Sequence, residues 1–191
     1  MAKTGYTTKT KENLQLDSGA YFKNFQVGTD TYENASSKLI GATSDGGTFT
    51  AKATYRQVKV DGVHGDLKGM EFIDRWDVNM TINTMEVTTD NLKLALGAAS
   101  SKVAETSWDL VEGKMDVEDA DFIENITFVG RISGTQEPII IQVLNSLCTE
   151  GLVLDSKDNG NAVVSLNFRG HLDDENLDKP PFRIYRPKKS E

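Results

Sequence analysis

The fold is decided by the stretch Glu71-Phe72-Ile73-Asp74-Arg75-Trp76-Asp77-Val78-Asn79-Met80-Thr81-Ile82-Asn83. Apolar and polar residues alternate along it, which is the pattern of a β-strand with one buried and one wet face. The buried face is expected to carry Phe72, Trp76, Val78, Met80 and Ile82. The wet face is expected to carry Glu71, Arg75, Asp77, Asn79, Thr81 and Asn83. The strand continues to about Val87, and at about 3.3 Å per residue it exceeds about 50 Å, so it either bends or belongs to something extended.

Outward from this strand, the remaining segments are also mostly β. Alternation from Thr48 to Tyr55 predicts a second strand, preceded by a turn at 44–47 and followed by a bulge or strand exit near Gln57. Further strands are predicted over Phe122–Ile132, Pro138–Leu144 and Val163–Gly170, with inward residues Phe122, Ile126, Phe128, Ile132, Val164, Leu166 and Phe168. The sequence therefore predicts a mainly β chain.

One helix is predicted over about residues 89–96. Thr88 or Thr89 can cap its first turn, Asp90 suits the dipole there, and Gly97 supplies the stop. The buried stripe of this helix is expected to be Leu92, Ala95 and Leu96. A helical turn is also expected within 145–150. The fold class that follows is mainly β: an antiparallel β-sandwich or partly closed barrel with one flanking α-helix.

The domain organisation is simple. Residues 1–19 are rich in threonine and lysine and are expected to form a flexible N-terminal arm, followed by a single β-sandwich domain over 20–191. A long glycine-rich loop is expected at 60–69, between two strands, and is a candidate functional loop.

Composition narrows the possible functions. The chain has 29 acidic and 21 basic residues, a net charge of −8, and no basic block, so it is not expected to grip nucleic acid phosphates as a monomer. No window approaches the about 18 consecutive apolar residues of a membrane span, so we expect no membrane partner. The N-terminus has no signal-peptide pattern, and Cys148 is the single cysteine, so synthesis in a cytoplasm and a buried thiol are expected.

Catalytic patterns are missing from the sequence. His64 and His171 have no partner at metal-ligand spacing, and the glycines of the loop do not match a phosphate-binding motif. Acidic groups at Asp116, Glu118, Asp119 and Asp121 and at Asp173-Asp174-Glu175 are better explained as solvated loops than as calcium sites. We therefore expect no enzyme activity, no metal and no cofactor. A β-sandwich carbohydrate-binding module, with Trp108 and the acidic loops as its site, remains an alternative, and a glycosidase a more remote one.

Several stretches in order carry a resemblance. The first half contributes Val58-Lys59-Val60-Asp61-Gly62, then Gly65 and Lys68-Gly69, then the long strand ending Asn83-Thr84-Met85-Glu86-Val87-Thr88. The second half contributes Leu152–Asp155, the turn Asp158-Asn159-Gly160, Val163–Gly170 with His171, an acidic patch, and Pro180-Pro181-Phe182-Arg183-Ile184-Tyr185. From Val58 on, this order resembles the major tail tube proteins of long-tailed bacteriophages.

The resemblance implies a structural subunit of a virion tail. It implies rings of six copies that stack into a hollow tube, with a lumen for the genome. It also implies that other tail proteins bind the tube ends, that DNA passes through without specific binding, and that the tube is assembled in the host bacterial cytoplasm. The wet face of the long strand would then line a negatively charged conduit, with Asp77, Asn79, Thr81 and Asn83 as lumen-facing candidates. The arm and loop would join subunits or rings, with candidates Lys3, Tyr6, Leu14, Asp61, Gly62, His64, Gly65, Lys68 and Gly69.

Overall fold

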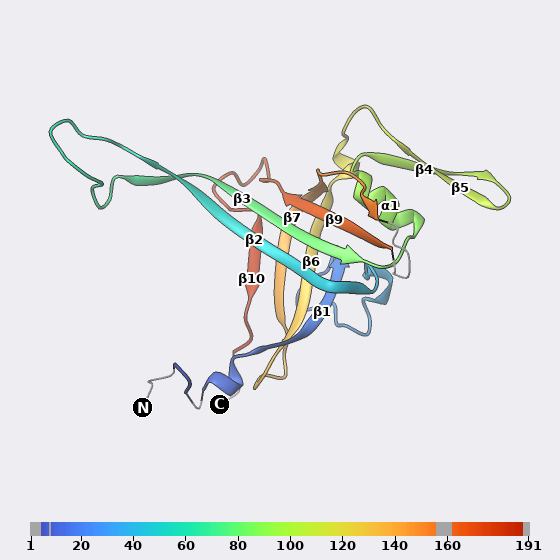
Figure 1. The fold of residues 1–191 in the computed structure, drawn as a ribbon, viewed down its shortest axis with the longest axis horizontal. Helices are drawn as coiled ribbons and strands as arrows, with labels where there is room; N and C mark the ends of the chain where they lie inside the picture. Colours follow the sequence, from blue (N-terminus) through green and yellow to red (C-terminus); the bar gives the residue numbers. More distant parts are fainter. Residues whose placement is uncertain (1–4, 8, 156–161, 189–191) are drawn as a thin grey trace.

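The computed structural model describes residues 5–7, 9–155 and 162–188. It is a mainly β structure with one α-helix, built around an antiparallel sheet that curls into a half-barrel (Figure 1). The predicted fold class is confirmed. Lys3 and the turn predicted at 158–160 lie outside the described residues.

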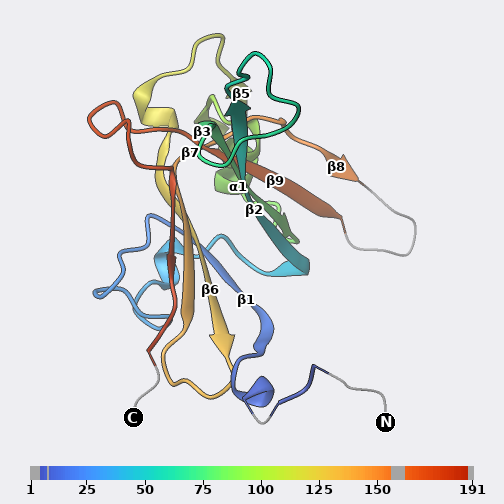
Figure 2. The same cartoon turned by 90° about the vertical axis from the view of Figure 1, so that its left-hand side faces the viewer.

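The curled sheet has eight strands in two groups. The main path runs β1-β6-β7-β9-β3-β2, β10 pairs with β7, and β8 pairs with β9. The strands are β1 (Gln15–Lys23), β2 (Thr43–Gln57), β3 (Glu71–Thr84), β6 (Ile123–Ile132), β7 (Ile139–Cys148), β8 (Leu154–Asp155), β9 (Val163–Gly170) and β10 (Phe182–Tyr185). In Figure 1 the group β2-β3-β9 crosses in front of the group β1-β6-β7-β10, and Figure 2 shows the same crossing from the side.

The core lies on the concave side, between the two groups. Val78, Met80 and Ile82 of β3 are completely buried there, as predicted. The buried residues that pack with them include Ile126, Val143, Cys148, Val164, Leu166 and Phe168. Trp76 packs against this core with its ring 5.3 Å from that of Phe182.

The helix α1 (Thr89–Leu96) has the predicted bounds and caps. The Thr88 hydroxyl accepts a hydrogen bond from the Asn91 N–H, and Gly97 ends the helix at φ 72°, a left-handed conformation that glycine adopts without steric cost. The predicted stripe is only partly correct, because Ala95 is buried whereas Leu92 and Leu96 are half-buried. The other buried residue of the helix is Asn91, whose amide donates to the carbonyls of Ile40 and Glu86.

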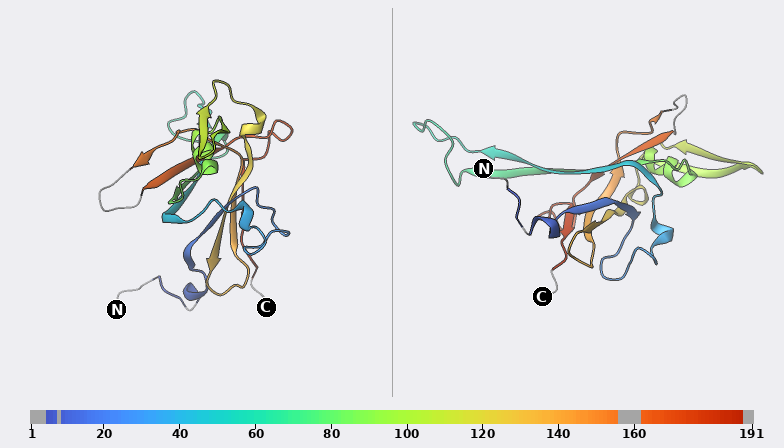
Figure 3. Two further views of the ribbon diagram at one scale, coloured as in Figure 1. Left: turned by 90° about the vertical axis from the view of Figure 1, so that its right-hand side faces the viewer. Right: turned by 60° about the horizontal axis from the view of Figure 1, so that its bottom comes forward.

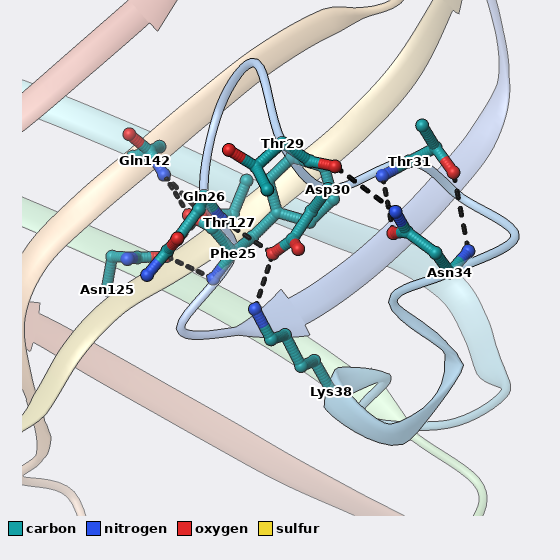
Figure 4. A network of polar contacts seen from close by, with 10 residues as sticks. All are labelled: Phe25, Gln26, Thr29, Asp30, Thr31, Asn34, Lys38, Asn125, Thr127 and Gln142. Atoms are coloured by element: carbon teal, nitrogen blue, oxygen red, sulfur yellow. Dashed lines mark hydrogen bonds and ion pairs between the residues drawn. The ribbon is translucent and has the colours of Figure 1, made fainter.

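A second layer covers the convex side of β1, β6 and β7. It is formed by the connection 24–42, which contains the short 3-10 helix η2 (Ser36–Lys38), and it buries Phe22, Phe25, Ala35 and Val129. A polar network fixes it, as Figure 4 shows: Gln142 donates to the Phe25 carbonyl at 2.9 Å and to the Thr127 hydroxyl at 3.0 Å. Asn125 Oδ1 completes the network by accepting from Thr127 and from the Phe25 N–H. The sheet is thus buried on both sides here, which alternation alone cannot indicate.

The prediction that Phe72 lies in the core is wrong. Thr54 pairs with Arg75 and Tyr55 with Ile73, so Asp74 is an extra residue that bulges out of β3. A one-residue bulge moves every side chain beyond it to the opposite face. Phe72 therefore lies beside Arg56 on the outer face, with the guanidinium carbon 5.9 Å from its ring centre, and is 49% exposed.

Three local predictions also need correction. The turn expected at 44–47 is a bulge inside β2, with Asp45 and Gly46 at positive φ, whereas the strand exit near Gln57 is confirmed. The helical turn expected within 145–150 is wrong, because β7 continues to Cys148 after Asn145 takes φ 46°, and residues 149 and 150 are not helical. β1 begins at Gln15, so residues 15–19 belong to the sheet rather than to an arm.

Two hairpins project from this body in opposite directions (Figures 1 and 3). One is the distal half of β2–β3 with its loop, and the other is β4 (Ala99–Glu105) paired with β5 (Trp108–Gly113), which the sequence analysis did not predict. Two further 3-10 turns, η1 (Thr10–Glu12) and η3 (Asp119–Asp121), lie in connections. Among the described residues, no helix has the length and apolar character that a membrane span requires.

The two aromatic residues of β3 test the assignment of faces. Trp76→Ala should lower the free energy of unfolding by about 3 kcal/mol, because a large aromatic is removed from the core margin. Phe72→Ala should cost less than about 1 kcal/mol, because its side chain lies outside the core. Urea unfolding of both variants measures the difference, and equal losses would contradict the bulge at Asp74.

Candidate assembly surfaces and polar face

Between the bulge at Asp74 and the other end of β3, the outer side of β2, β3 and β9 forms a continuous polar surface, which we call the polar face. Cross-strand pairing places its side chains in rows, for example Lys52 opposite Asp77, and Thr50 and Asn79 beside Arg169. Its members are Thr48, Thr50, Lys52, Thr54, Arg75, Asp77, Asn79, Thr81, Asn83, Ser165, Asn167 and Arg169, and none of them is buried. The four lumen-facing candidates of β3 therefore share one face, with Asn79 exposed and Asp77, Thr81 and Asn83 half-buried.

Asp77 is the electrostatic centre of the polar face. One of its oxygens lies 3.3 Å from Arg75 Nε and accepts from the Thr54 hydroxyl at 3.5 Å, and the other lies 3.6 Å from Arg169 Nη2. Lys52 is its direct cross-strand neighbour. Two arginines thus contact one carboxylate, and a lysine lies opposite it in the strand register.

The sign of the polar face differs from that of the whole chain. Its ionisable members are Lys52, Arg75, Arg169 and Asp77, so its formal charge is 3 − 1 = +2, against −8 for the chain. The other eight members are threonine, serine and asparagine. The negative lining expected from composition therefore finds no support on this face.

The distal half of the β2–β3 hairpin is the first candidate assembly surface. Tyr55 and Ile73, cross-strand partners beyond the bulge, are 63% and 51% exposed. The connection 58–70 adds further exposed apolar side chains, namely Val58, Val60, Val63 and Leu67. The predicted loop candidates Asp61, Gly62, His64, Gly65, Lys68 and Gly69 are all exposed and lie together in this connection. Solvent-exposed apolar groups on a projecting hairpin favour contact with another protein surface.

The free edge of β2 is the second candidate assembly surface. β2 is 15 residues long and pairs with β3 on one side, and its other side has no strand partner within the described part of the chain. An unpaired edge presents N–H and C=O groups that can bind another strand.

The two described arm candidates lie at the opposite end of the sheet. Tyr6 is 57% exposed and Leu14 is 48% exposed. The Leu14 N–H donates to the Ser133 hydroxyl, and the Ser133 N–H donates to the Leu14 carbonyl. Arg186 donates to the Asn13 side chain at 2.6 Å, so the two terminal segments meet here. Among the described residues, no hydrogen bond or ion pair joins Tyr6 or Leu14 to the loop 58–70.

The histidines and acidic groups make local structural contacts. His171 lies edge-on against Phe122 and its Nδ1 is 3.0 Å from the Asn145 carbonyl oxygen, whereas His64 is exposed in the loop. Lys114 contacts Glu118 at 2.7 Å and Asp121 at 2.8 Å. No three histidine, cysteine, aspartate or glutamate side chains converge as metal ligands in residues 5–7, 9–155 and 162–188.

Trp108, the residue of the carbohydrate alternative, is 70% exposed near the tip of the β4–β5 hairpin. Cavities of about 630, 400 and 280 Å³ lie elsewhere, and Trp108 lines none of these three. The first of them opens between β1 and β2, where Tyr21, Phe49 and Met80 form its apolar part. Burial of the Tyr21 side chain raises the pKa of its hydroxyl, so this hydroxyl stays neutral.

The contact between Lys114 and Asp121 predicts an acid-dependent stability. The hydrogen bond from Lys114, with that from the Glu118 N–H, lowers the pKa of Asp121 below its usual 3.8. Because the folded-state pKa is the lower one, the stabilisation is complete above pH 3.8 and is lost as pH falls through the folded-state value. Asp121→Asn should therefore flatten the fall in melting temperature below pH 4, whereas Asp119→Asn, on the exposed side of η3, should leave it unchanged. An unaltered profile for Asp121→Asn would contradict this assignment.

No protein-family model matches the chain, and no curated protein does either.

Proposed function

We propose that this chain is a structural subunit of a bacteriophage tail tube, which assembles with copies of itself into stacked hexameric rings. The hollow centre conducts the genome, other tail proteins bind the tube ends, and the mature protein resides in the virion after assembly in the host cytoplasm. The proposal follows from the order of sequence motifs that resembles tail tube proteins. It assigns the chain no catalytic step.

The observation that carries the proposal is the projecting half of the β2–β3 hairpin. Its side chains Tyr55, Phe72 and Ile73 are each about half exposed or more, although they are apolar and lie on both faces of the hairpin. Fully burying an exposed apolar side chain is worth about 1.5–3 kcal/mol, and about half of that is still to be gained by side chains that are half exposed, so their exposure in a subunit favours association. A hairpin of this form would reach the next subunit or ring.

The free edge of β2 supports the same proposal. A long exposed edge is an aggregation hazard in a monomer, but it is removed when a closed ring pairs each edge with a neighbour. The polar face, which lies on the same strands, would then face away from the subunit core and toward water in the channel. Asp77, Asn79, Thr81 and Asn83 keep their assignment as lumen candidates within this proposal.

The carbohydrate-binding alternative rests on the exposure of Trp108 alone. Sugar-binding sites combine an aromatic platform with polar groups in a concave surface. Trp108 lies near a hairpin tip and lines none of the three cavities described above. The assembly function is therefore the better supported one.

Size-exclusion chromatography with light scattering and negative-stain microscopy test assembly directly. The purified chain should form rings or filaments, and the double variant Phe72→Ser/Ile73→Ser should remain a folded small species, because the apolar contact surface is lost. Leu177→Ser is the matched control: Leu177 is 67% exposed but lies in the connection before β10, far from the hairpin in sequence, and this variant should assemble normally.

Two other results would count against the proposal. A wild-type chain that stays monomeric at high concentration and across salt conditions would contradict a tube subunit. Retention on an immobilised glycan, lost in Trp108→Ala, would instead support the carbohydrate alternative.

A further inference from the structure

The polar face carries a charge that assembly does not explain. Around Asp77, cations lie on three adjacent strands: Arg75 of β3 and Arg169 of β9 contact its carboxylate at 3.3 and 3.6 Å, and Lys52 of β2 is its cross-strand neighbour. A single carboxylate neutralises one of them, so about two positive charges stay uncompensated. This occurs in a chain whose acidic residues outnumber the basic ones by 29 to 21.

The neighbours of this cluster are small uncharged side chains that form hydrogen bonds. Thr50 and Asn79 are exposed beside Arg169, and the remaining rows contain the small polar residues Thr48, Thr54, Thr81, Asn83, Ser165 and Asn167. Lysine, arginine, threonine, serine and asparagine are the side chains that contact phosphate oxygens and sugars in nucleic acid complexes. In Figure 1 the strands β2, β3 and β9 lie in front of β1, β6 and β7, so the outer side of these three strands faces the viewer.

We propose that the polar face makes weak, sequence-independent contacts with the phosphates of nucleic acid, through Lys52 and the two arginines that flank Asp77. Asp77 sets the strength: it holds Arg75 and Arg169 in place and cancels part of their charge. Lys52, which faces it from the edge strand, supplies a cation on a flexible stem. The face is the outer side of three paired strands, and the flat side of a sheet does not enter a DNA groove to reach base edges, so the contact is with the backbone.

The inference rests on the proposed function in one respect, because a tube brings this face to the genome. Few cations per subunit give contacts that salt weakens strongly and that break readily. A passing duplex would therefore exchange phosphates from one subunit to the next instead of being repelled by the wall. The strongly negative remainder of the chain keeps the duplex from binding elsewhere on it.

The test uses the full chain, before and after assembly, and a short fluorescein-labelled DNA duplex followed by fluorescence anisotropy. At an ionic strength of about 10 mM, where the screening length is about 30 Å, wild type should bind measurably. Lys52→Gln should weaken binding about three- to tenfold and reduce the slope of log K against log salt by about 0.9, because one phosphate contact is lost. Asp77→Asn should do the opposite and tighten binding, because it removes the one negative charge of the face.

Lys102→Gln is the matched control. It makes the same change in net charge, but Lys102 lies on β4 in an ion pair with Glu112 at 2.8 Å, away from the polar face. Its affinity for the duplex should equal that of wild type. Thermal unfolding of all variants checks that the fold is kept, as expected for exposed ion pairs.

The results test the phosphate contact and the tube assembly independently of each other. Opposite shifts for Lys52→Gln and Asp77→Asn support phosphate contact even if the chain never assembles. Tubes that form normally while none of the variants changes DNA affinity, or a wild type that does not bind at low salt, would overturn the phosphate contact and leave the tube intact. Variants that lose assembly instead of DNA affinity would show that the polar face is a subunit interface, and this result would also overturn the phosphate contact.

Discussion

One short ladder joins the two groups of strands, and the half-barrel depends on it. β7 and β9 pair through three residue pairs, Ser146 with Gly170, Leu147 with Arg169 and Cys148 with Phe168. The ladder begins at Ser146, directly after Asn145 with its positive φ, and its partner Gly170 has no side chain: a Cβ there would lie 2.8 Å from Val143 Cγ1. This close approach brings β3 over the core and leaves its other side, the polar face, open to solvent.

Local sequence signals predicted the parts of the fold that depend on local chemistry. The caps of α1 and the alternation of Val78, Met80 and Ile82 needed only neighbouring residues to be recognised, and both are confirmed. The bulge at Asp74 could not be predicted, because it exists only in the register between β2 and β3. The continuation of β7 past Asn145 was missed for a similar reason, since β9 supplies its partner from far along the chain.

In the candidate site too, some features depend on neighbouring residues and others on pairing between strands. Alternation predicted that Asp77, Asn79, Thr81 and Asn83 share a face, and in the register of β2 and β3 they do, but the composition of the whole chain does not give the charge of that face. The sign is set by Lys52 and Arg169, which reach Asp77 only through cross-strand pairing. Net charge is a property of the whole surface, whereas a ligand meets one face within a screening length of about 8 Å.

The placement of the hairpin limits the symmetry of any assembly it makes. Phe72 and Ile73 belong to the β2–β3 hairpin, which projects from one end of the molecule, and the β4–β5 hairpin projects from the other (Figure 3). A contact made by such an arm on a different surface of a second copy is heterologous, because the two patches are not the same. Repeated heterologous contacts close into a ring or continue as a filament, and they do not stop at a dimer. An exposed hairpin tip and a free β2 edge on one chain therefore supply two independent contacts, which are what a ring and a stack of rings require.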